Sequence, residues 1–537
     1  MRRVPACGSG MARVLVLGAF CACGAAPDDA TGPRSALVGR VVDEAGRPLA
    51  GALVAAAAAG SSLRRATVSD EHGRFQIELE GPALDLPHEV ALADPRFTSS
   101  RASARAGGAP VELRAGAVPE ADRLAPSAEW LALLPDGERK RWFQLDCTGC
   151  HQLNETRASR EGAPRSAEQW NADAARMHRM FGPDAGFPIL SGYLATTDLG
   201  AWLAPALARP RTPLPRRGID SRFTLTEYDL PGPDLPHDLA VDAAGRVLVT
   251  GMFTDRILVL DPATGATTPV EIPVERANPR AIEIDRQGNW WVLLGAAQRI
   301  ARYEPQAKRW TSAEVGFYGH SIALDREGAA WTNDHFAREA PRLARVRPGA
   351  ALTAELHAGP PFRTAAKGPS PIPYELRAAG DGRIWLSLLH GNAVVAFSPE
   401  TGAFESLPLP DPDAGPRRFD LDARGDLWIP GYASSTLYRL DPRSRRFERH
   451  PLPIPDALPY VVRVDPGSGD VWIGTGAADA LLRFDPESGE FSIYPVPTRG
   501  ATMRHLVLDP ATGDVWIAYG ASPAIHPTRI ARLKRTN

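Results

Sequence analysis

The sequence predicts a multidomain, mainly β protein with an N-terminal β-sandwich, a small all-α domain and a C-terminal seven-bladed β-propeller. Three observations predict this architecture. The 537 residues exceed what one hydrophobic core supports. Apolar and polar residues alternate over residues 36–115, and apolar residues then recur at helical spacing over residues 118–204. From residue 219 to residue 537 the chain repeats a pattern of short strands.

The composition is that of a globular protein, with 44% hydrophobic and 23% charged residues. The formal net charge of −2 supplies no long-range field that would attract nucleic acid or an anionic membrane. Neither partner is therefore expected.

Residues 1–25 are typical of an export signal. Arg2, Arg3 and Arg13 precede the apolar run at 14–20, which is too short to span a bilayer. Cys23 lies in a weak lipoprotein cleavage site, so either a lipid anchor on Cys23 or simple cleavage is expected, and Met11 is an alternative start to Met1. No other segment is apolar for long enough to cross a membrane. The predicted location is the periplasm, or a membrane-anchored lipoprotein facing the periplasm or the exterior.

Residues 36–115 consist of short alternating runs separated by turn signals, which predicts a small antiparallel β-sandwich. The runs GRVVDEAGRPLAGALV at 39–54 and TVSDEHGRF at 67–75 resemble the carboxypeptidase regulatory-like domain. That resemblance implies a non-catalytic module. A structural spacer is the expected role, with adhesion or carbohydrate contact as the alternative.

Residues 118–204 are predicted to be helical. Ser166 and Gln169 fit a capping box, and Trp170, Ala174, Met177 and Phe181 then follow on one helix face. A further helix is expected around 198–207, and the Pro- and Arg-rich stretch at 205–218 is predicted to be a linker to the repeats at 219–537.

Seven repeat units follow one another at intervals of about 40 to 45 residues in most cases, and six of the seven contain a strand of the form Gly-x-x-Trp. The last unit, ending near residue 533, lacks its outer strand, and an unmatched strand of that type occupies 223–230. Pairing these two segments would close the ring of blades and leave no open edge. The residues that start the equivalent inner strands should encircle the central channel: His237, Arg280, His320, Tyr374, Arg417, Tyr460 and Arg504. This ring of cations, imidazoles and phenols would favour an anionic or aromatic small molecule.

The sharpest motif is Cys147-Thr148-Gly149-Cys150-His151. Two thiols one helical turn apart can each form a thioether with a haem vinyl group, and the adjacent imidazole can then bind the iron. A local disulfide, half of a zinc site and a thioredoxin-like motif are the alternatives. Zinc would need further ligands, and a thioredoxin-like motif would need a βαβ context.

The helix from Trp170 to Met180 resembles the ligand-bearing segment of small cytochrome c-like domains. The resemblance implies a second iron ligand on this helix, with Met177, which follows Arg176, as the first candidate. Met180 is the second candidate, and His178 or an open position complete the set. The expected cofactor is covalent haem c, with an electron-transfer protein as a possible partner.

Residues 223–535 resemble the virginiamycin B lyase family, the streptogramin lyases. The shared features are the openings of the units and the tryptophans of the second strands: Trp291, Trp331, Trp385, Trp428, Trp472 and Trp516. These tryptophans are expected to be packing residues. The resemblance implies Glu residues three positions after each Trp, serving Mg²⁺ and proton transfer, but here those positions hold Gly251, Leu294, Asp334, Leu388, Gly431, Thr475 and Tyr519. Only Asp334 is acidic, which puts Mg²⁺ binding in doubt.

Three functions remain open. The first is an exported haem c protein with an electron-transfer or redox role, in which the propeller binds a substrate or partner. The second is a Mg²⁺-dependent C–O lyase in which His237, His320 or His505 acts as base beside Asp334. The third is a non-catalytic binding module.

Overall fold

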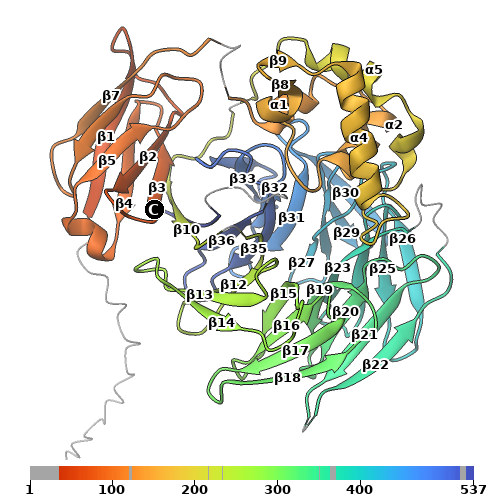
Figure 1. The fold of residues 1–537 in the computed structure, drawn as a ribbon. Helices are drawn as coiled ribbons and strands as arrows, with labels where there is room; N and C mark the ends of the chain where they lie inside the picture. The colour runs from red at the N-terminus through yellow and green to blue at the C-terminus, as the bar shows by residue number, and fades with distance from the viewer. Residues whose placement is uncertain are drawn as a thin grey trace, which may run out of the picture. The chain divides into compact units, whose positions relative to one another are not determined.

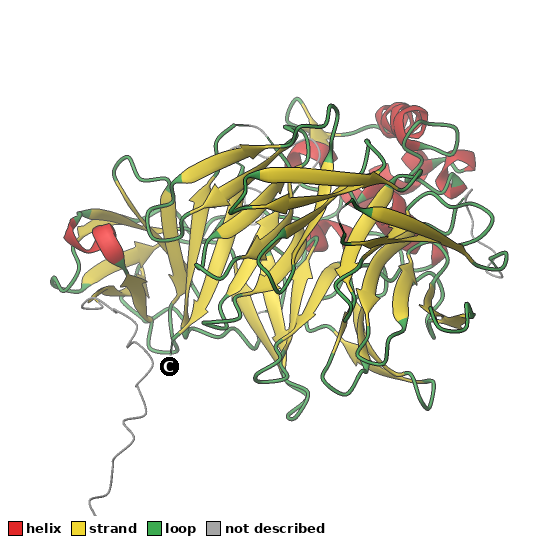
Figure 2. Ribbon diagram, turned by 90° about the horizontal axis from the view of Figure 1, so that it is seen from below, coloured by secondary structure: helices red, strands yellow, loops and turns green. Residues whose placement is uncertain are grey.

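The computed structural model describes residues 35–119, 124–215, 217–232, 234–349, 351–362, 370–520 and 528–536. The export signal predicted for residues 1–25 and the lipid anchor predicted for Cys23 lie outside these residues. Strands are the main regular structure of the described chain, and its α-helices lie between residues 127 and 207 (Figures 1 and 2). No helix in the described ranges is long and apolar enough to cross a membrane.

The N-terminal β domain is built from seven strands around one apolar core. Gly39 and Gly73 allow close backbone approach, since a Cβ atom at either position would lie within 2.6 Å of a backbone oxygen. Leu37, Phe75 and Ile77 are buried between its sheets. The strands are β1 (Ser35–Asp43), β2 (Leu53–Ala58), β3 (Leu63–Val68), β4 (Arg74–Leu79), β5 (His88–Leu92), β6 (Arg101–Ala104) and β7 (Val111–Ala115), with a 3₁₀ turn η1 (Gly81–Asp85).

The helical segment follows this domain, and its longest helix begins as predicted. Ser166 and Gln169 form the capping box reciprocally, and Asp198 caps the last helix through the Ala201 amide. The elements are α1 (Ser127–Leu131), α2 (Glu138–Cys147), α3 (Glu155–Ala158), β8 (Ser159–Arg160), β9 (Ala163–Pro164), α4 (Ala167–Phe181), η3 (Tyr193–Thr196) and α5 (Leu199–Leu207).

The C-terminal region consists of repeated four-stranded antiparallel sheets, and Figure 1 shows successive sheets following one another from green to blue. The first sheet consists of β11 (Pro236–Val241), β12 (Val247–Gly251), β13 (Arg256–Leu260) and β14 (Thr267–Glu271). The second sheet consists of β15 (Pro279–Ile284), β16 (Trp290–Leu294), β17 (Arg299–Glu304) and β18 (Arg309–Glu314). The third sheet consists of β19 (Gly319–Leu324), β20 (Ala330–Asp334), β21 (Arg342–Arg347) and β22 (Thr353–Ala358). The fourth sheet consists of β23 (Pro373–Ala378), β24 (Ile384–Leu388), β25 (Ala393–Phe397) and β26 (Phe404–Pro408). The fifth sheet consists of β27 (Asp420–Leu421), β28 (Leu427–Gly431), β29 (Thr436–Asp441) and β30 (Arg446–Pro451). The sixth sheet consists of β31 (Pro459–Val464), β32 (Val471–Thr475), β33 (Ala480–Phe484) and β34 (Phe491–Pro495).

A recurring turn explains why each Gly-x-x-Trp strand follows its neighbour. In Asp285-Arg286-Gln287-Gly288, the Asp285 carboxylate accepts the backbone N–H of Gln287 and Asn289, and Gly288 has a φ of 82°. The indole of Trp291 then donates to the same carboxylate at 3.1 Å. All six repeat tryptophans are at most 2% exposed, which confirms that they are packing residues.

The predicted closure of the ring is confirmed. The last sheet is β35 (Met503–Leu508), β36 (Val515–Tyr519), β37 (Arg529–Arg535) and β10 (Phe223–Asp229), so its outer strand comes from the start of the propeller region. Leu225 pairs with Leu533 of β37 on one side. On its other side Leu225 pairs with Ala66 of β3, a contact that no pattern in the sequence predicts. The N-terminal domain therefore covers the outer edge of the closing sheet.

Candidate functional site

The CxxCH motif lies at the end of α2. Cys147 is the last residue of that helix, and the Thr148 hydroxyl donates to the Gln144 carbonyl at 2.6 Å, which satisfies one of the free carbonyls of the final turn. Tyr432 of the propeller donates to the Thr148 carbonyl at 2.9 Å. Cys147 and Cys150 are both half-buried free thiols, so the local disulfide is not formed in this structure.

All the predicted haem ligands line one cavity of about 410 Å³, which we call the helical cavity. Cys147, Cys150 and His151 contribute one part of its wall, and the helix α4 contributes Met177, His178 and Met180. The predicted apolar face of α4 reaches the same cavity through Trp170, Ala174 and Phe181. No residue of this 15-residue amphipathic helix is fully buried, because its apolar face borders open space rather than packed protein.

The helical cavity is lined by a neutral imidazole, half-buried thiols and several cationic side chains. Burial lowers the pKa of His151, so its ring is neutral near pH 7 and has a lone pair for a metal. Burial, together with Asp146 and Cys150, raises the pKa of the Cys147 thiol. Three guanidinium groups also line the cavity: Arg157, Arg165 and Arg176.

The three candidates for the second iron ligand differ in their surroundings. Met177 is half-buried, whereas Met180 is 54% exposed. The Nδ1 atom of His178 is buried and has no hydrogen-bond partner. Met177 and His178 are therefore better placed than Met180.

The seven residues predicted to form a ring do lie together: all seven line a second cavity of about 330 Å³ at one end of the central channel. We call it the funnel cavity. In six of the sheets a β-bulge interrupts the pairing between the inner strand and its neighbour at this end. Bulges re-aim side chains, which accounts for charged or polar residues at consecutive positions such as His237-Asp238 and Arg504-His505 facing the channel.

One half of this ring contacts the CxxCH segment. Arg504 donates to the carbonyls of Gly149 and Cys150 at 3.2 and 3.0 Å, and it also donates to the Tyr460 hydroxyl at 2.8 Å. Arg417 donates to Tyr374 at 2.8 Å, and the Tyr374 and Tyr460 hydroxyls share a short hydrogen bond. Burial alone would raise the pKa of Tyr460, but Arg504, Arg417 and Arg418 lower it to about 8. This half of the ring holds the CxxCH segment over the channel.

The other half of the ring faces open space. His237, Arg280 and His320 line this part of the cavity together with His335, Tyr318 and Phe187. The register of the repeats predicts only the first three. Phe187 comes from the segment after α4, so its place could not be read from the propeller repeats. His335 directly follows Asp334, and this irregular His after a repeat strand is the signal that was missed.

The candidate lyase residues do not share one pocket. The Asp334 carboxylate is held by the guanidinium of Arg342, at 2.7 Å from its Nε, and does not line the funnel cavity. His505 instead borders a cavity of about 450 Å³ elsewhere on the channel, where its Nε2 lies 2.8 Å from the Arg463 guanidinium. Within the described ranges, no three or more His, Cys, Asp or Glu side chains are grouped so that they could hold a metal ion.

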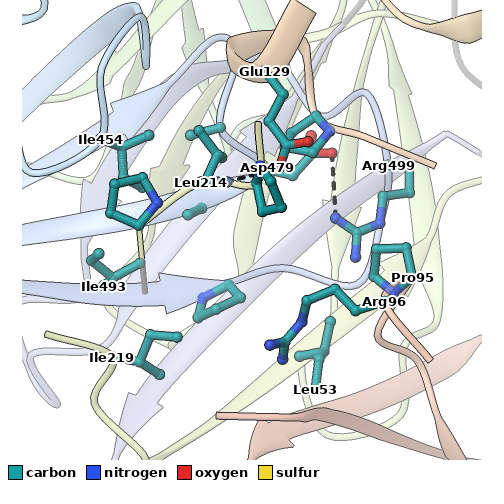
Figure 3. Close-up of a pocket in the computed structure, with 16 residues that line it drawn as sticks. Leu53, Pro95, Arg96, Glu129, Leu214, Ile219, Ile454, Asp479, Ile493 and Arg499 are labelled. Carbon is teal, nitrogen blue, oxygen red and sulfur yellow. Dashed lines mark hydrogen bonds and ion pairs between the residues drawn. The ribbon is translucent and has the colours of Figure 1, made fainter. Parts of the chain in front are cut away.

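A smaller cavity of about 220 Å³ lies where the N-terminal domain, α1 and the propeller meet (Figure 3). Arg96 is paired with Asp94 at 2.7 Å, and Arg499 lies 3.6 Å from Asp479. Glu129 accepts the backbone N–H of Leu214. Because its charged groups are already paired, this cavity is a packing junction rather than a candidate site.

Five buried histidines of the propeller predict acid sensitivity: His237, His320, His335, His390 and His505. Burial lowers the pKa of each, to about 3 for His237 and His390. The unfolded chain therefore binds more protons than the folded chain below the ordinary histidine pKa of 6.5. Buried carboxyl groups act in the opposite direction and offset part of this effect, above all Asp146, whose pKa burial raises to about 7.

We expect the free energy of unfolding to fall by roughly 2 kcal/mol from pH 7 to pH 6, and to fall further towards pH 5. Denaturant unfolding at these pH values checks this, and His237→Gln should reduce the slope. A free energy of unfolding that is constant or rises as the pH falls would contradict the prediction.

Comparisons with known proteins agree with two parts of this architecture. Residues 36–113 match the family described as Carboxypeptidase regulatory-like domain, which confirms that resemblance. No curated protein sequence matches the chain. Among solved structures, that of streptogramin B lyase superposes with a TM-score of 0.51 at 18% sequence identity and covers 58% of this chain and 98% of its own. Virginiamycin B lyase from Staphylococcus aureus gives a TM-score of 0.50 at 18% identity over 58% of this chain and 99% of that chain. At these identities the likeness shows the propeller fold alone.

Proposed function

We propose that the chain is an exported redox protein that carries one covalent c-type haem in the helical cavity and binds a small ligand in the funnel cavity. One observation carries this proposal. Cys147, Cys150 and His151 border the same cavity as Met177 and His178, although at least 26 positions separate the two groups in the sequence. A cavity of about 410 Å³ lies within the usual range for cofactor sites.

The side chains that line the helical cavity fit a covalent haem c. The two free thiols, separated by two residues, suit two thioether bonds, and the neutral imidazole of His151 suits an iron ligand. Arg157 offers a cation for a carboxylate of haem, and Arg165, which already pairs with Asp173, offers a further N–H because its Nε is buried without a partner. When bound, haem c supplies one-electron exchange. The apolar face of α4 would exclude water from it.

In this proposal the propeller binds the ligand, because its funnel cavity adjoins the helical cavity. Asp146, Cys150 and Phe181 line both the helical cavity and the funnel cavity. A ligand in the funnel cavity would therefore lie on the other side of the Cys150 backbone from the cofactor. Arg504 fixes that backbone through two carbonyls, which keeps the partition between the cavities in place.

The N-terminal β domain has a structural role in this proposal. Its strand β3 covers the free edge of β10, as a spacer module with no catalytic task would. The Mg²⁺-dependent lyase is not proposed, because Arg342 neutralises Asp334 outside the funnel cavity.

The second iron ligand can be identified by substitution. We expect Met177→Ala to remove the near-infrared charge-transfer band of a thioether-ligated ferric haem, while covalent attachment through the two cysteines persists. Met180→Ala, at the more exposed position, is the matched control and should leave the band unchanged. If His178→Ala changes the spectrum and Met177→Ala does not, the iron ligand is His178.

The proposal itself is tested by the absorption spectrum of the full chain purified from the periplasm of a host competent for haem attachment. Denatured protein should retain its colour and give the pyridine haemochrome of a c-type haem. Colourless protein from such a host would overturn the proposal.

A further inference from the structure

Two histidines of the funnel cavity are fixed in a single tautomer. The Nδ1 atom of His320 lies 3.0 Å from the Tyr374 carbonyl, and the Nδ1 atom of His335 lies 2.8 Å from the Pro373 carbonyl. Because a carbonyl oxygen only accepts, each Nδ1 must carry the proton, and each Nε2 of the neutral ring is an acceptor. Each histidine is only 1% exposed, and both Nε2 atoms are buried without a hydrogen-bond partner.

These rings stay neutral near pH 7. Burial and the guanidinium of Arg280 hold the pKa of both histidines well below its ordinary value. Two buried acceptors without donors are costly unless a bound group donates to them. The cavity therefore favours a ligand with an O–H or N–H group.

The same cavity holds a buried cation without a balancing carboxylate. Arg280 is 5% exposed and forms no ion pair with a described acidic residue. It donates to the Tyr318 hydroxyl at 3.1 Å, and Tyr318 in turn donates to Asn278 at 2.7 Å. The Nε of Arg280 is buried without a partner. The one carboxyl in the cavity wall, Asp146, already accepts from Ser191.

Aromatic rings form the remaining wall. Phe187 packs against Tyr318 with ring centroids 5.4 Å apart, and His320 stacks on His335 at 4.5 Å. Flat apolar faces of this kind accept a planar ring. The volume of about 330 Å³ is at the lower end of the range for small-molecule sites, so the ligand is small.

From these features we infer that the funnel cavity binds a small aromatic carboxylate that bears a hydroxyl group, with its carboxylate at Arg280 and its hydroxyl donating to His320 or His335. The inference rests on the proposed function in one respect, namely that this molecule would lie beside the haem. The binding chemistry itself depends on the propeller and on Phe187.

The test is isothermal titration of the full-length, haem-loaded protein with 4-hydroxybenzoate, 4-methoxybenzoate and 4-hydroxybenzyl alcohol. We expect 4-hydroxybenzoate to bind at least about tenfold more tightly than 4-methoxybenzoate, which cannot donate a hydrogen bond. The neutral alcohol should also bind more weakly, because it lacks the charge that Arg280 requires. Equal affinities for the hydroxy and methoxy acids, or no binding of 4-hydroxybenzoate, would overturn the inference.

Variants assign the preference to the named residues. His320→Phe and His335→Phe together should abolish the preference for the hydroxyl, and Arg280→Ala should weaken both acids about equally. His357→Phe, which changes a histidine on the outer strand β22, is the matched control and should bind as the wild type does. A double variant that retains the full preference would overturn the inference. The ligand series on the wild-type protein decides the question if a variant does not fold. A colourless protein that still prefers 4-hydroxybenzoate would overturn the haem proposal alone.

Discussion

Replacing both Cys147 and Cys150 with serine is expected to abolish covalent haem attachment completely. Serine cannot form a thioether, and the two thiols are the only cysteines after residue 25. The propeller should remain folded, because its sheets and tryptophans make their contacts independently of these sulfur atoms. The pyridine haemochrome of denatured protein and a thermal melt measure the two outcomes separately.

The matched control for this experiment is Thr148→Ser, which lies between the two cysteines. It keeps a hydroxyl for the Gln144 carbonyl and should retain the colour of the wild type. Covalent haem in the double serine variant would show that the attachment site lies elsewhere.

Deleting residues 219–230 is expected to prevent folding to a soluble, closed propeller. The segment supplies β10, which pairs with β37 on one side and β3 on the other, so its loss exposes two strand edges. It also buries Phe223, Leu225, Tyr228 and Leu230, each worth about 2 kcal/mol, and the sum is comparable to the whole stability of a domain. Aggregation on size-exclusion chromatography and a lowered melting temperature are the expected results.

A single substitution tests the same closure without shortening the chain. Leu225→Asp places a carboxylate at a fully buried position of β10 and should lower the melting temperature sharply. Thr268→Asp, at an exposed position of the outer strand β14, is the matched control and should have little effect. If the deletion variant or Leu225→Asp melts at the wild-type temperature, β10 is not needed to close the ring.

The repeats made the propeller predictable in some detail. Each unit carries its own turn, tryptophan and strand pattern, so the blade order and the missing outer strand could be read from local spacing. The capping box at Ser166 was predictable for the same reason, since a cap depends on residues three positions apart. The pairing of β3 with β10 was not predictable, because the sequence of an edge strand does not indicate which strand will pair with it.

The site was predictable only in its parts. The register of the repeats brought His237, Arg280 and His320 together, and the CxxCH motif identified the cysteines. That Arg417 and Arg504 would face the CxxCH segment, while Arg280 faces a cavity, depends on how the helical segment packs. Such packing is set by contacts between distant segments, for example Lys140 with Asp456 at 2.9 Å, and no periodicity records it.

The most direct test of the central proposal is the intact mass of the mature protein, isolated from a periplasm competent for haem attachment and measured under denaturing conditions. The account predicts the mass of the processed chain plus one haem, with the added mass on the peptide that contains Cys147 and Cys150. A denatured chain of unmodified mass, with both thiols free to react with an alkylating reagent, would contradict it.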